Sequence, residues 1–359
     1  MEQGRISHKS DSSDASTLEV AVVGAGISGL ICARTLSDLG HRVRVIDKAR
    51  GPGGRMSTRR ADGLRYDHGA QYFTVSDPRF KVMVESWRRE GVVGPWNGTV
   101  VVLGAGGTRS EDRTTVRFVG VPGMNAVCRR LADDLDVTFD TEIRDLGRRD
   151  GLWTLTDTEG KQFGAFDVVV VSAPAPQTEI LLGERAPKLA VRARKVEMAP
   201  CWAVMVTFPR PLGLGWDAAF VNDSPLSWIV RNASKPGRPN HESWVLHASP
   251  EWSRRFLELD PASVSDRLAR AFYDAVGSVE SCHDHIDAHR WRFSLPVSPL
   301  PEPCLIDAEV GLAACGDWCG GPRVEGAFLS GLSVAQGIHA RRRGFFRISN
   351  HEPRSHELE

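Results

Sequence analysis

The feature that most constrains this chain is a glycine-rich turn between two apolar runs near its N-terminus. An apolar run from Glu19 ends at Gly24, and the spacing Gly24-x-Gly26-x-x-Gly29 follows. A helical pattern then leads into a second apolar run, which ends at Asp47. The first glycine permits a tight turn, the second lets the backbone approach a pyrophosphate, and the third lets the helix lie close to the sheet. This order of strand, turn, helix, strand and acid predicts a dinucleotide-binding unit.

Asp47 and the segment after it indicate which dinucleotide is bound. The helix N-terminus, at Ser28, offers unpaired N–H groups and a partial positive charge to phosphates. Asp47 is placed to accept hydrogen bonds from an adenosine ribose, where a 2′-phosphate would interfere, so we expect FAD or NAD rather than NADP. Residues 48–60 (KARGPGGRMSTRR) combine Gly, Pro and cations, which suits a loop around a second phosphate-bearing surface. This favours FAD, although an exposed basic turn is the alternative interpretation of that loop.

Several motifs resemble those of known flavoproteins. Four segments resemble motifs of the flavin amine oxidase superfamily: residues 22–30 (VVGAGISGL), 53–56 (GGRM), 67–73 (DHGAQYF) and 316–335 (GDWCGGPRVEGAFLSGLSVA). The chain resembles bacterial renalase-like proteins more closely. The segments that carry this resemblance are residues 48–60, 231–238 (RNASKPGR), 244–253 (WVLHASPEWS) and 289–294 (HRWRFS). The resemblance extends from about Val20 to Gly337, and it implies a FAD-dependent oxidoreductase.

The expected fold class is α/β, with a Rossmann-type FAD-binding domain on a parallel sheet and an α+β substrate domain on a mixed or antiparallel sheet. The chain has 359 residues, more than the ~250–300 at which single cores usually divide. We expect a disordered tail over 1–17, a discontinuous FAD-binding domain over 18–80, 120–180 and 302–340, a substrate domain over 81–119 and 181–301, and a second tail over 341–359.

Periodicity predicts the elements within these domains. Residues 152–156 and 162–166 alternate around the turn at 157–160, which is typical of a hairpin. The β-branched run 167–172 predicts a strand buried on both faces. Further strands are expected over 137–143, 202–208, 243–248 and 310–314, and helices from 125 to 134 and from 324 to 340.

The resemblance also implies how a non-covalently bound FAD is held. Asp317 would bind the ribityl or pyrophosphate region, and the backbone at 325–328 would face the isoalloxazine. Residues near Ile143 would lie against the adenine, and the segment 67–72 would run past the flavin ring. For Asp317, a helix N-cap is the alternative role. The predicted cofactor-binding residues are Gly24, Gly26, Ser28, Gly29, Asp47, Lys48, Gly54, Arg55, Gly69, Ala70, Gln71, Ile143, Asp317, Glu325, Gly326 and Ala327.

Few acid–base motifs are needed if a flavin carries out the chemistry, because the protein then has only to bind, position and tune the reactants. The candidate catalytic residues are His68, Gln71, Trp228, His247 and Trp291. For His68 a satisfied core histidine is the alternative, and aromatic residues on strands are more often core than ligand contacts. Relatives that oxidise amines place a lysine near flavin N5, but Lys195 has no clear register and receives no role.

The resemblance to renalase-like proteins implies a substrate. Such enzymes oxidise misreduced nicotinamide dinucleotides, the 2- and 6-dihydro isomers of NAD(P), to NAD(P)+ by hydride transfer to flavin N5, and oxygen is then reduced to hydrogen peroxide. Arg231, Lys235 and Arg238 in a Pro/Gly loop would suit a charged dinucleotide, although a solvated loop is the alternative. An amine oxidase or desaturase-type flavoenzyme, and a non-catalytic flavin-binding regulatory protein, remain open.

Charge and hydropathy limit the other partners. The 45 basic and 45 acidic residues cancel, so no nucleic-acid or membrane partner is expected. No apolar segment approaches the ~20 residues that span a bilayer, and we expect a cytoplasmic protein of unspecified oligomeric state. The histidines between His283 and His289 alternate on one strand face without a familiar metal spacing, so a half-exposed strand or loop without metal is expected.

Overall fold

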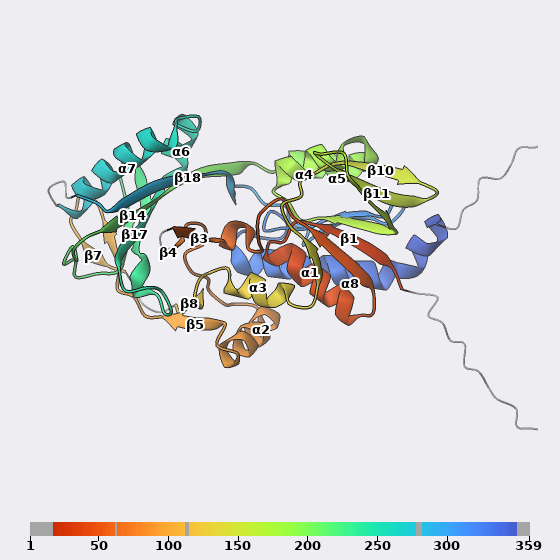
Figure 1. Ribbon diagram of the computed structural model, residues 1–359, viewed down its shortest axis with the longest axis horizontal. Helices are drawn as coiled ribbons and strands as arrows, with labels where there is room; N and C mark the ends of the chain where they lie inside the picture. Colours follow the sequence, from red (N-terminus) through yellow and green to blue (C-terminus); the bar gives the residue numbers. More distant parts are fainter. Residues whose placement is uncertain (1–16, 62, 112–114, 278–281, 350–359) are drawn as a thin grey trace, which may run out of the picture.

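The chain folds into two parts that lie side by side, and two long strands, β14 (Met198–Phe208) and β18 (His285–Pro296), lead from one part toward the other (Figure 1). The computed structural model describes residues 17–61, 63–111, 115–277 and 282–349. Most of the predicted N-terminal tail, and residues 350–359 of the predicted C-terminal tail, lie outside the described residues. None of the helices in the described ranges has the length and apolar character needed to cross a membrane.

The first part contains a six-stranded sheet of order β19-β20-β13-β1-β2-β9. All its pairings are parallel except β19 with β20. The strand bounds are β1 Glu19–Val23, β2 Arg42–Ile46, β9 Asp136–Thr138, β13 Val168–Val171, β19 Leu305–Asp307 and β20 Leu312–Ala314. Because the sheet is covered on both faces, its central strand β13 is apolar throughout, and its four valines are fully buried, as predicted.

Helices cover one face of this sheet, and a mixed layer covers the other. On the first face, α1 (Ile27–Asp38), α3 (Ala126–Ala132) and α8 (Arg323–Ser349) share a core with Val20 and Val22 of β1. On the opposite face, Ala21 lies in a second core with α4 (Ala175–Leu182), α5 (Pro187–Arg194) and a three-stranded sheet. That sheet contains β10 (Ile143–Arg149), β11 (Leu152–Asp157) and β12 (Gln162–Phe166), the last two of which form the predicted hairpin.

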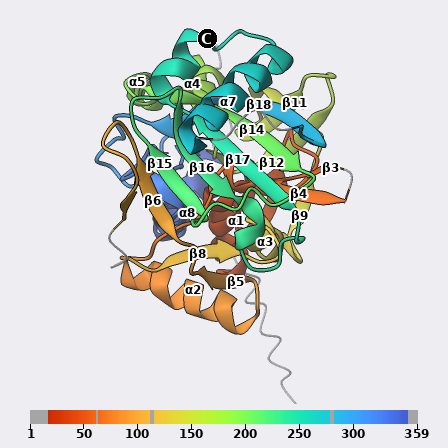
Figure 2. The same ribbon diagram turned by 90° about the vertical axis from the view of Figure 1, so that its left-hand side faces the viewer.

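The second part is a seven-stranded sheet of order β18-β14-β17-β16-β15-β6-β7, antiparallel except between β15 and β6. Its remaining strands are β6 Val100–Leu103, β7 Arg109–Ser110, β15 Ala218–Val221, β16 Leu226–Arg231 and β17 Glu242–Ala248. Helices α6 (Pro250–Arg255) and α7 (Pro261–Val276) lie over one face (Figure 2). Helix α7 begins at the N-cap Asp260 and ends at Gly277, whose φ of 66° stops the helix. It packs on Trp202 and Trp244. The other face of the sheet is therefore left to meet the first part.

Smaller elements connect the two parts. They are the hairpin β3 (Thr58–Ala61) and β4 (Leu64–Asp67), helix α2 (Pro78–Arg89), the pair β5 (Val93–Trp96) and β8 (Arg117–Gly120), and the 3-10 turns Gly54–Met56, Gly183–Arg185 and Asn232–Ser234. Two of the expected domain boundaries differ from the packing. Trp87 of α2 contacts Phe328 of α8, with ring centroids 6.2 Å apart, and α5 shares a core with β13. Helices α2 and α5 thus pack with the nucleotide-binding part.

Two predicted elements have different bounds. Helix α8 continues past 340 to Ser349, because Phe345 is buried in the core and Arg341 donates a hydrogen bond back to the Gly337 carbonyl. The single strand expected over 137–143 is divided into β9 and β10, since Asp140 has a φ of 52° that turns the chain between them.

Candidate active site

A cavity of about 2310 Å³ lies between the two parts. Small-molecule sites usually have volumes of ~300–1,000 Å³, so this cavity has room for more than one ligand. The structure brings most of the predicted residues together in its lining: Gly24, Gly26, Ser28, Asp47, Lys48, Gly54, Arg55, His68, Gly69, Ala70, Gln71, Ile143, Trp228, His247, Trp291, Asp317 and Ala327. The predicted residues Gly29, Glu325 and Gly326 are outside that lining.

The glycine-rich turn after β1 forms one end of the cavity. Gly24 has a φ of 116°, and a Cβ there would lie 2.4 Å from the carbonyl oxygen of Ser172. A Cβ on Gly26 would meet no atom within 4 Å, so this backbone is open to the cavity. A Cβ on Gly29 would lie 2.0 Å from the Gly24 carbonyl oxygen. Gly29 therefore allows helix α1 to pack closely on the turn and does not line the cavity. Helix α1 has Gly26 as its N-cap residue and no side-chain cap, and its first N–H groups can therefore bind an anion.

The carboxylate of Asp47 stands at the end of β2 beside this turn. It accepts hydrogen bonds from the backbone N–H groups of Ala25 and, at 2.7 Å, of Ala49. Burial raises its pKa, and the two N–H groups and Lys48 oppose that effect. Asp47 occupies the position of the acid in a dinucleotide-binding unit. In such units the carboxylate accepts a hydrogen bond from a ribose hydroxyl as well as from nearby backbone N–H groups.

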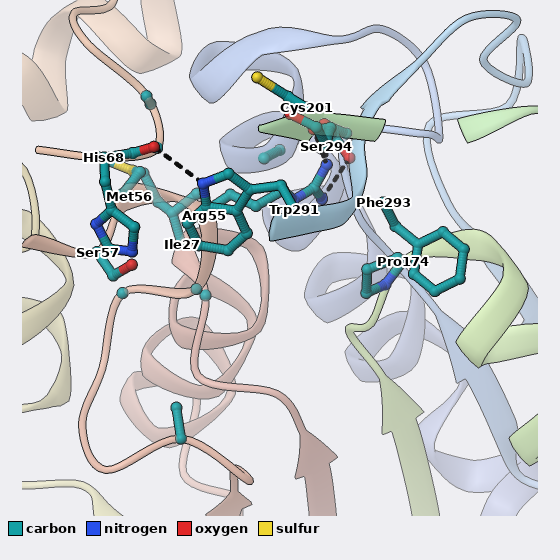
Figure 3. A pocket seen from close by; sticks show the side chains of 18 of the residues that line it. Ile27, Arg55, Met56, Ser57, His68, Pro174, Cys201, Trp291, Phe293 and Ser294 are labelled. Carbon is teal, nitrogen blue, oxygen red and sulfur yellow. Dashed lines mark hydrogen bonds and ion pairs between the residues drawn. The ribbon is translucent and has the colours of Figure 1, made fainter. Parts of the chain in front are cut away.

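Arg55 connects the N-terminal and C-terminal motifs. Its guanidinium donates two hydrogen bonds of 2.7 Å to the Asp317 carboxylate. It donates a third, of 3.0 Å, to the Ser294 carbonyl (Figure 3). Its own carbonyl accepts from the Ala70 N–H at 2.8 Å, and a Cβ on Gly69 would lie 2.0 Å from that oxygen. Gly69 is thus required by the approach of the Arg55 backbone. Asp317 does not cap α8, which begins six residues later at Arg323.

Glu325 and Gly326 have structural roles that the sequence did not indicate. The Glu325 carboxylate accepts hydrogen bonds from the backbone N–H groups of Ser76, at 2.8 Å, and Asp77, just before α2. A Cβ on Gly326 would lie 2.0 Å from the Gly321 carbonyl. In this motif, Val324 and Ala327 line the cavity instead.

One row of side chains across the second sheet forms the opposite wall of the cavity. The pairing register sets Phe220 of β15 opposite Trp228 of β16, and Trp228 opposite His247 of β17. The row continues through Ala203 of β14 to His289 of β18. Directly opposed residues share one face of a sheet, so these side chains point away from α7 and toward the first part. All of them except Ala203 line the cavity.

His68 lies where the β4 segment meets this wall. Its carbonyl accepts hydrogen bonds from Trp291 Nε1 at 2.9 Å and His247 Nε2 at 3.2 Å, and its ring is stacked on Trp291 with centroids 5.1 Å apart (Figure 3). Burial, and then the nearby His289 and Arg59, lower its pKa to about 3. His68 is therefore neutral at physiological pH, and its buried Nδ1 has no hydrogen-bond partner among the described residues.

Trp228 lies among other rings at the far end of the cavity. Its ring centroid is 4.6 Å from that of Phe220 and 5.7 Å from that of Tyr72. The Arg117 guanidinium lies 5.1 Å from the Tyr72 ring centroid and is ion-paired with Glu111. The Trp228 indole is only 7% exposed, and its buried N–H has no acceptor within the part of the chain that the structure describes.

The cationic loop at 231–238 does not face the cavity, so both sequence interpretations of it are wrong. Lys235 Nζ lies 2.7 Å from Gln71 Oε1 and 3.3 Å from Asp67 Oδ2. Arg238 Nε lies 3.1 Å from the same Asp67 oxygen, and the side chains of both cations are at most 1% exposed. Arg231 pairs with Asp217 at 2.6 Å. The loop is held inside by a carboxylate far away in the sequence. Lys195 is exposed after α5 and does not line the cavity.

Two protein-family profiles match successive parts of the chain. The profile of an NAD(P)-binding Rossmann-like domain matches residues 22–87, and that of flavin containing amine oxidoreductases matches residues 87–339. The chain belongs to the flavin containing amine oxidoreductase family. It is an FAD-dependent oxidoreductase, with a Rossmann-like domain joined to an amine oxidase domain.

Relatives of this flavoenzyme differ in what they share with it. A 4,4'-diapophytoene desaturase of Staphylococcus haemolyticus is 40% identical over 72 residues, which cover 20% of this chain and only 14% of the desaturase. A proposed protoporphyrinogen oxidase from Exiguobacterium has a TM-score of 0.73 at 13% identity, over 90% of this chain and 99% of that one. Cyclohexylamine oxidase from Brevibacterium oxydans has a TM-score of 0.69 at 12% identity, over 91% and 100%. At such identities the structural likeness shows the fold alone.

The residues of this flavoenzyme fit FAD. The open backbone at Gly26 and the uncapped start of α1 suit a pyrophosphate, and Asp47 suits the adenosine ribose. Arg55 and Asp317, from opposite ends of the sequence, meet at one place in the lining. In the sequence, Arg55 and Asp317 belong to two separate glycine-rich motifs, and nothing there indicates that they form an ion pair. Asp67 received no role from the sequence, and the Pro/Gly composition around Lys235 led to its interpretation as part of a substrate-binding or solvated loop.

Proposed function

We propose that this flavoenzyme oxidises dihydronicotinamide dinucleotides of the 2- and 6-dihydro type to NAD(P)+, with oxygen as the final acceptor and hydrogen peroxide as the product. The observation that carries the proposal is the buried Trp228 N–H, which has no acceptor among the described residues although its ring contacts those of Phe220 and Tyr72. An indole N–H is a donor only, and burying it without a partner is costly. A ligand at this end of the cavity is therefore expected to be flat and to carry an acceptor.

The candidate substrates differ in whether they have that acceptor. A nicotinamide ring has a flat face for the surrounding aromatic side chains and a carboxamide oxygen for Trp228. A protonated amine has only donors, and a polyene has neither donors nor acceptors. The Trp228 N–H therefore favours a dihydronicotinamide over the amine and desaturase alternatives.

A dinucleotide substrate also carries phosphates, and the cavity offers cations for them. Arg59 and Arg60 of β3 and Arg290 and Arg292 of β18 line it. Arg59 is paired with Asp287 at 2.6 Å, and Arg292 with Glu258 at 2.6 Å. Guanidinium groups already held by one carboxylate can still direct free N–H groups to a phosphate. The cavity volume leaves room for this second dinucleotide beside FAD.

The roles of the protein groups follow from their contacts. Bound FAD supplies the redox chemistry, accepting a hydride from the dihydropyridine carbon and passing the electron pair to oxygen. Trp228 would orient the carboxamide, and Phe220 and Tyr72 would hold the ring plane. His68 is neutral and is fixed by its stacking on Trp291, so it can donate or accept a hydrogen bond without adding charge to the cavity.

The test is anaerobic mixing of the purified holoenzyme with 6-dihydro-NAD, 2-dihydro-NAD, ordinary 4-dihydro-NAD, cyclohexylamine or a diapophytoene emulsion. We expect the flavin absorbance to be bleached by the first two, and peroxide to form when air is admitted. A flavin that stays oxidised with both would remove the proposal, and bleaching by the amine or the polyene alone would favour that alternative.

A variant links this result to the observation behind it. Trp228→Phe keeps the ring and removes the donor, so we expect KM for the dihydronicotinamide to rise about 3- to 10-fold, the usual value of one neutral hydrogen bond. Trp216→Phe is the matched control, because Trp216 packs on Trp244 on the opposite face of the sheet and should leave KM unchanged. An unchanged KM in Trp228→Phe would refute the assigned hydrogen bond.

A further inference from the structure

A buried excess of positive charge lies behind one wall of the cavity. Lys235 and Arg238 share a single carboxylate, that of Asp67, and the three side chains are at most 1% exposed. The other titratable groups coupled to this cluster are His68 and His247, which are neutral because burial lowers their pKa values to about 3 and about 4. Burial also lowers the pKa of Lys235, to about 8, so its ammonium group stays charged at pH 7. Two cations and one anion therefore leave the cluster with one uncompensated positive charge. An unpaired charge is costly to bury, and the single carboxylate of Asp67 can neutralise only one of the two cations.

The Gln71 side chain connects this charge with the lining of the cavity. Lys235 Nζ donates to Gln71 Oε1 at 2.7 Å, and Gln71 Nε2 donates to the carbonyls of Gly69, at 2.9 Å, and Asp67. An ammonium group can only donate and a carbonyl can only accept, so these contacts fix the orientation of the amide. Gln71 and Gly69 themselves line the cavity. The ammonium of Lys235 therefore lies one side chain behind the cavity wall.

We propose that the Asp67–Lys235–Arg238 cluster stabilises the negative charge that the bound flavin gains on reduction, with Lys235 as a positioning residue that acts through Gln71. Hydride transfer brings one proton and two electrons to a neutral oxidised flavin, so one negative charge enters the cavity while the donor carbon becomes positive. Fixed charges directed at the place where charge develops need no reorganisation during the reaction. The cluster would act in this way for any hydride donor, so the inference goes beyond the proposed substrate.

The size of the effect follows from Coulomb's law. At an effective dielectric constant of about 20, a unit charge at about 10 Å changes an equilibrium by roughly 15-fold. Removing the Lys235 charge should therefore lower the equilibrium constant for two-electron reduction about tenfold, which is about 30 mV toward more negative potential. The substitution should affect folding much less, because Asp67 keeps Arg238 as its counter-ion.

The experiment measures the midpoint potential of the FAD holoenzyme by equilibration with redox dyes, together with its thermal unfolding midpoint. Lys235→Met removes the charge, Lys235→Arg keeps it, and Lys188→Met removes one lysine charge from an exposed pair with Glu309. We expect a more negative potential only in Lys235→Met. We also expect its unfolding midpoint to fall much less than that of Asp67→Asn. No enzyme substrate is used, so the result is independent of whether the proposed function holds.

Three outcomes would overturn the inference. The first is a Lys235→Met potential within threefold of wild type in equilibrium constant. The second is a Lys235→Met protein that unfolds, loses FAD or is destabilised as much as Asp67→Asn, since Lys235 would then be only a structural partner of Asp67. The third is a Lys235→Arg holoenzyme with the same potential loss as Lys235→Met, because the charge would not be responsible.

Discussion

The Asp67→Asn substitution is the most direct test of how this site is held together. Asp67 is fully buried and accepts hydrogen bonds from Thr58, at 2.8 Å, and from the backbone N–H of Met124, at 2.9 Å, as well as from Lys235 and Arg238. An asparagine keeps the shape but leaves two buried cations without a counter-ion. Removing one partner of a buried ion pair typically costs about 3–5 kcal/mol, so we expect a loss of that order in the free energy of unfolding.

The pH dependence of this stabilisation has a definite sign. Burial alone would raise the pKa of Asp67, but Lys235, Arg238 and the Met124 N–H lower it to about 2. In the unfolded chain an aspartate has a pKa near 3.9, so the folded state binds its proton less readily. The stabilisation is therefore complete above about pH 4 and is lost as the pH falls toward 2. Asp67→Asn should remove this part of the acid transition.

The assay is urea unfolding of the holoenzyme, followed by tryptophan fluorescence, for wild type, Asp67→Asn and a control. Asp136→Asn breaks an exposed pair with Arg44 and should cost less than about 1 kcal/mol. In the double variant Asp67→Asn, Lys235→Met, removal of one unpaired cation should recover part of the loss. A cost below about 1 kcal/mol for Asp67→Asn, or no recovery in the double variant, would refute the reasoning.

Two further predictions concern other parts of the fold. Burial lowers the pKa of His68 to about 3 and that of His247 to about 4, against about 6.5 in the unfolded chain. The free energy of unfolding should therefore fall by up to about 1.4 kcal/mol per pH unit for each histidine as the pH drops below 6.5. Urea midpoints at pH 7, 6 and 5 that do not change would contradict this. Gly331→Ala should destabilise the protein, because its Cβ would lie 2.1 Å from the Ser28 carbonyl, whereas Gly344→Ala in the same helix meets no atom within 4 Å and should be neutral or stabilising in thermal unfolding.

Local patterns explain why much of the nucleotide-binding part was predictable. The glycine spacing after β1, the valine run of β13 and the hairpin of β11 and β12 each depend on residues close in sequence. The row from Phe220 to His289 could not be predicted, because it depends on the register of five strands. A one-residue shift in any of those pairings would turn the side chains to the other face.

Long-range charge pairing explains the clearest failure of sequence reasoning. A loop with Pro236, Gly237 and three cations has the composition of a solvated surface, and only a partner 168 positions away buries it. Asp67 itself lay within a recognised motif but had no assigned role, since a single acid after a short strand is usually solvated.

The charge states of the cavity lining support hydride chemistry over proton chemistry at the substrate carbon. His68 and His247 are held neutral by burial, and their pKa values of about 3 and about 4 make them weak bases for removing a proton at neutral pH. A general acid or base works best with a pKa near the operating pH. Loss of a hydride from a dihydropyridine gives an aromatic pyridinium with no proton to remove, so neutral histidines do not limit it. What that step requires is a place for the negative charge, and the net positive cluster behind Gln71 lies where it can meet this need.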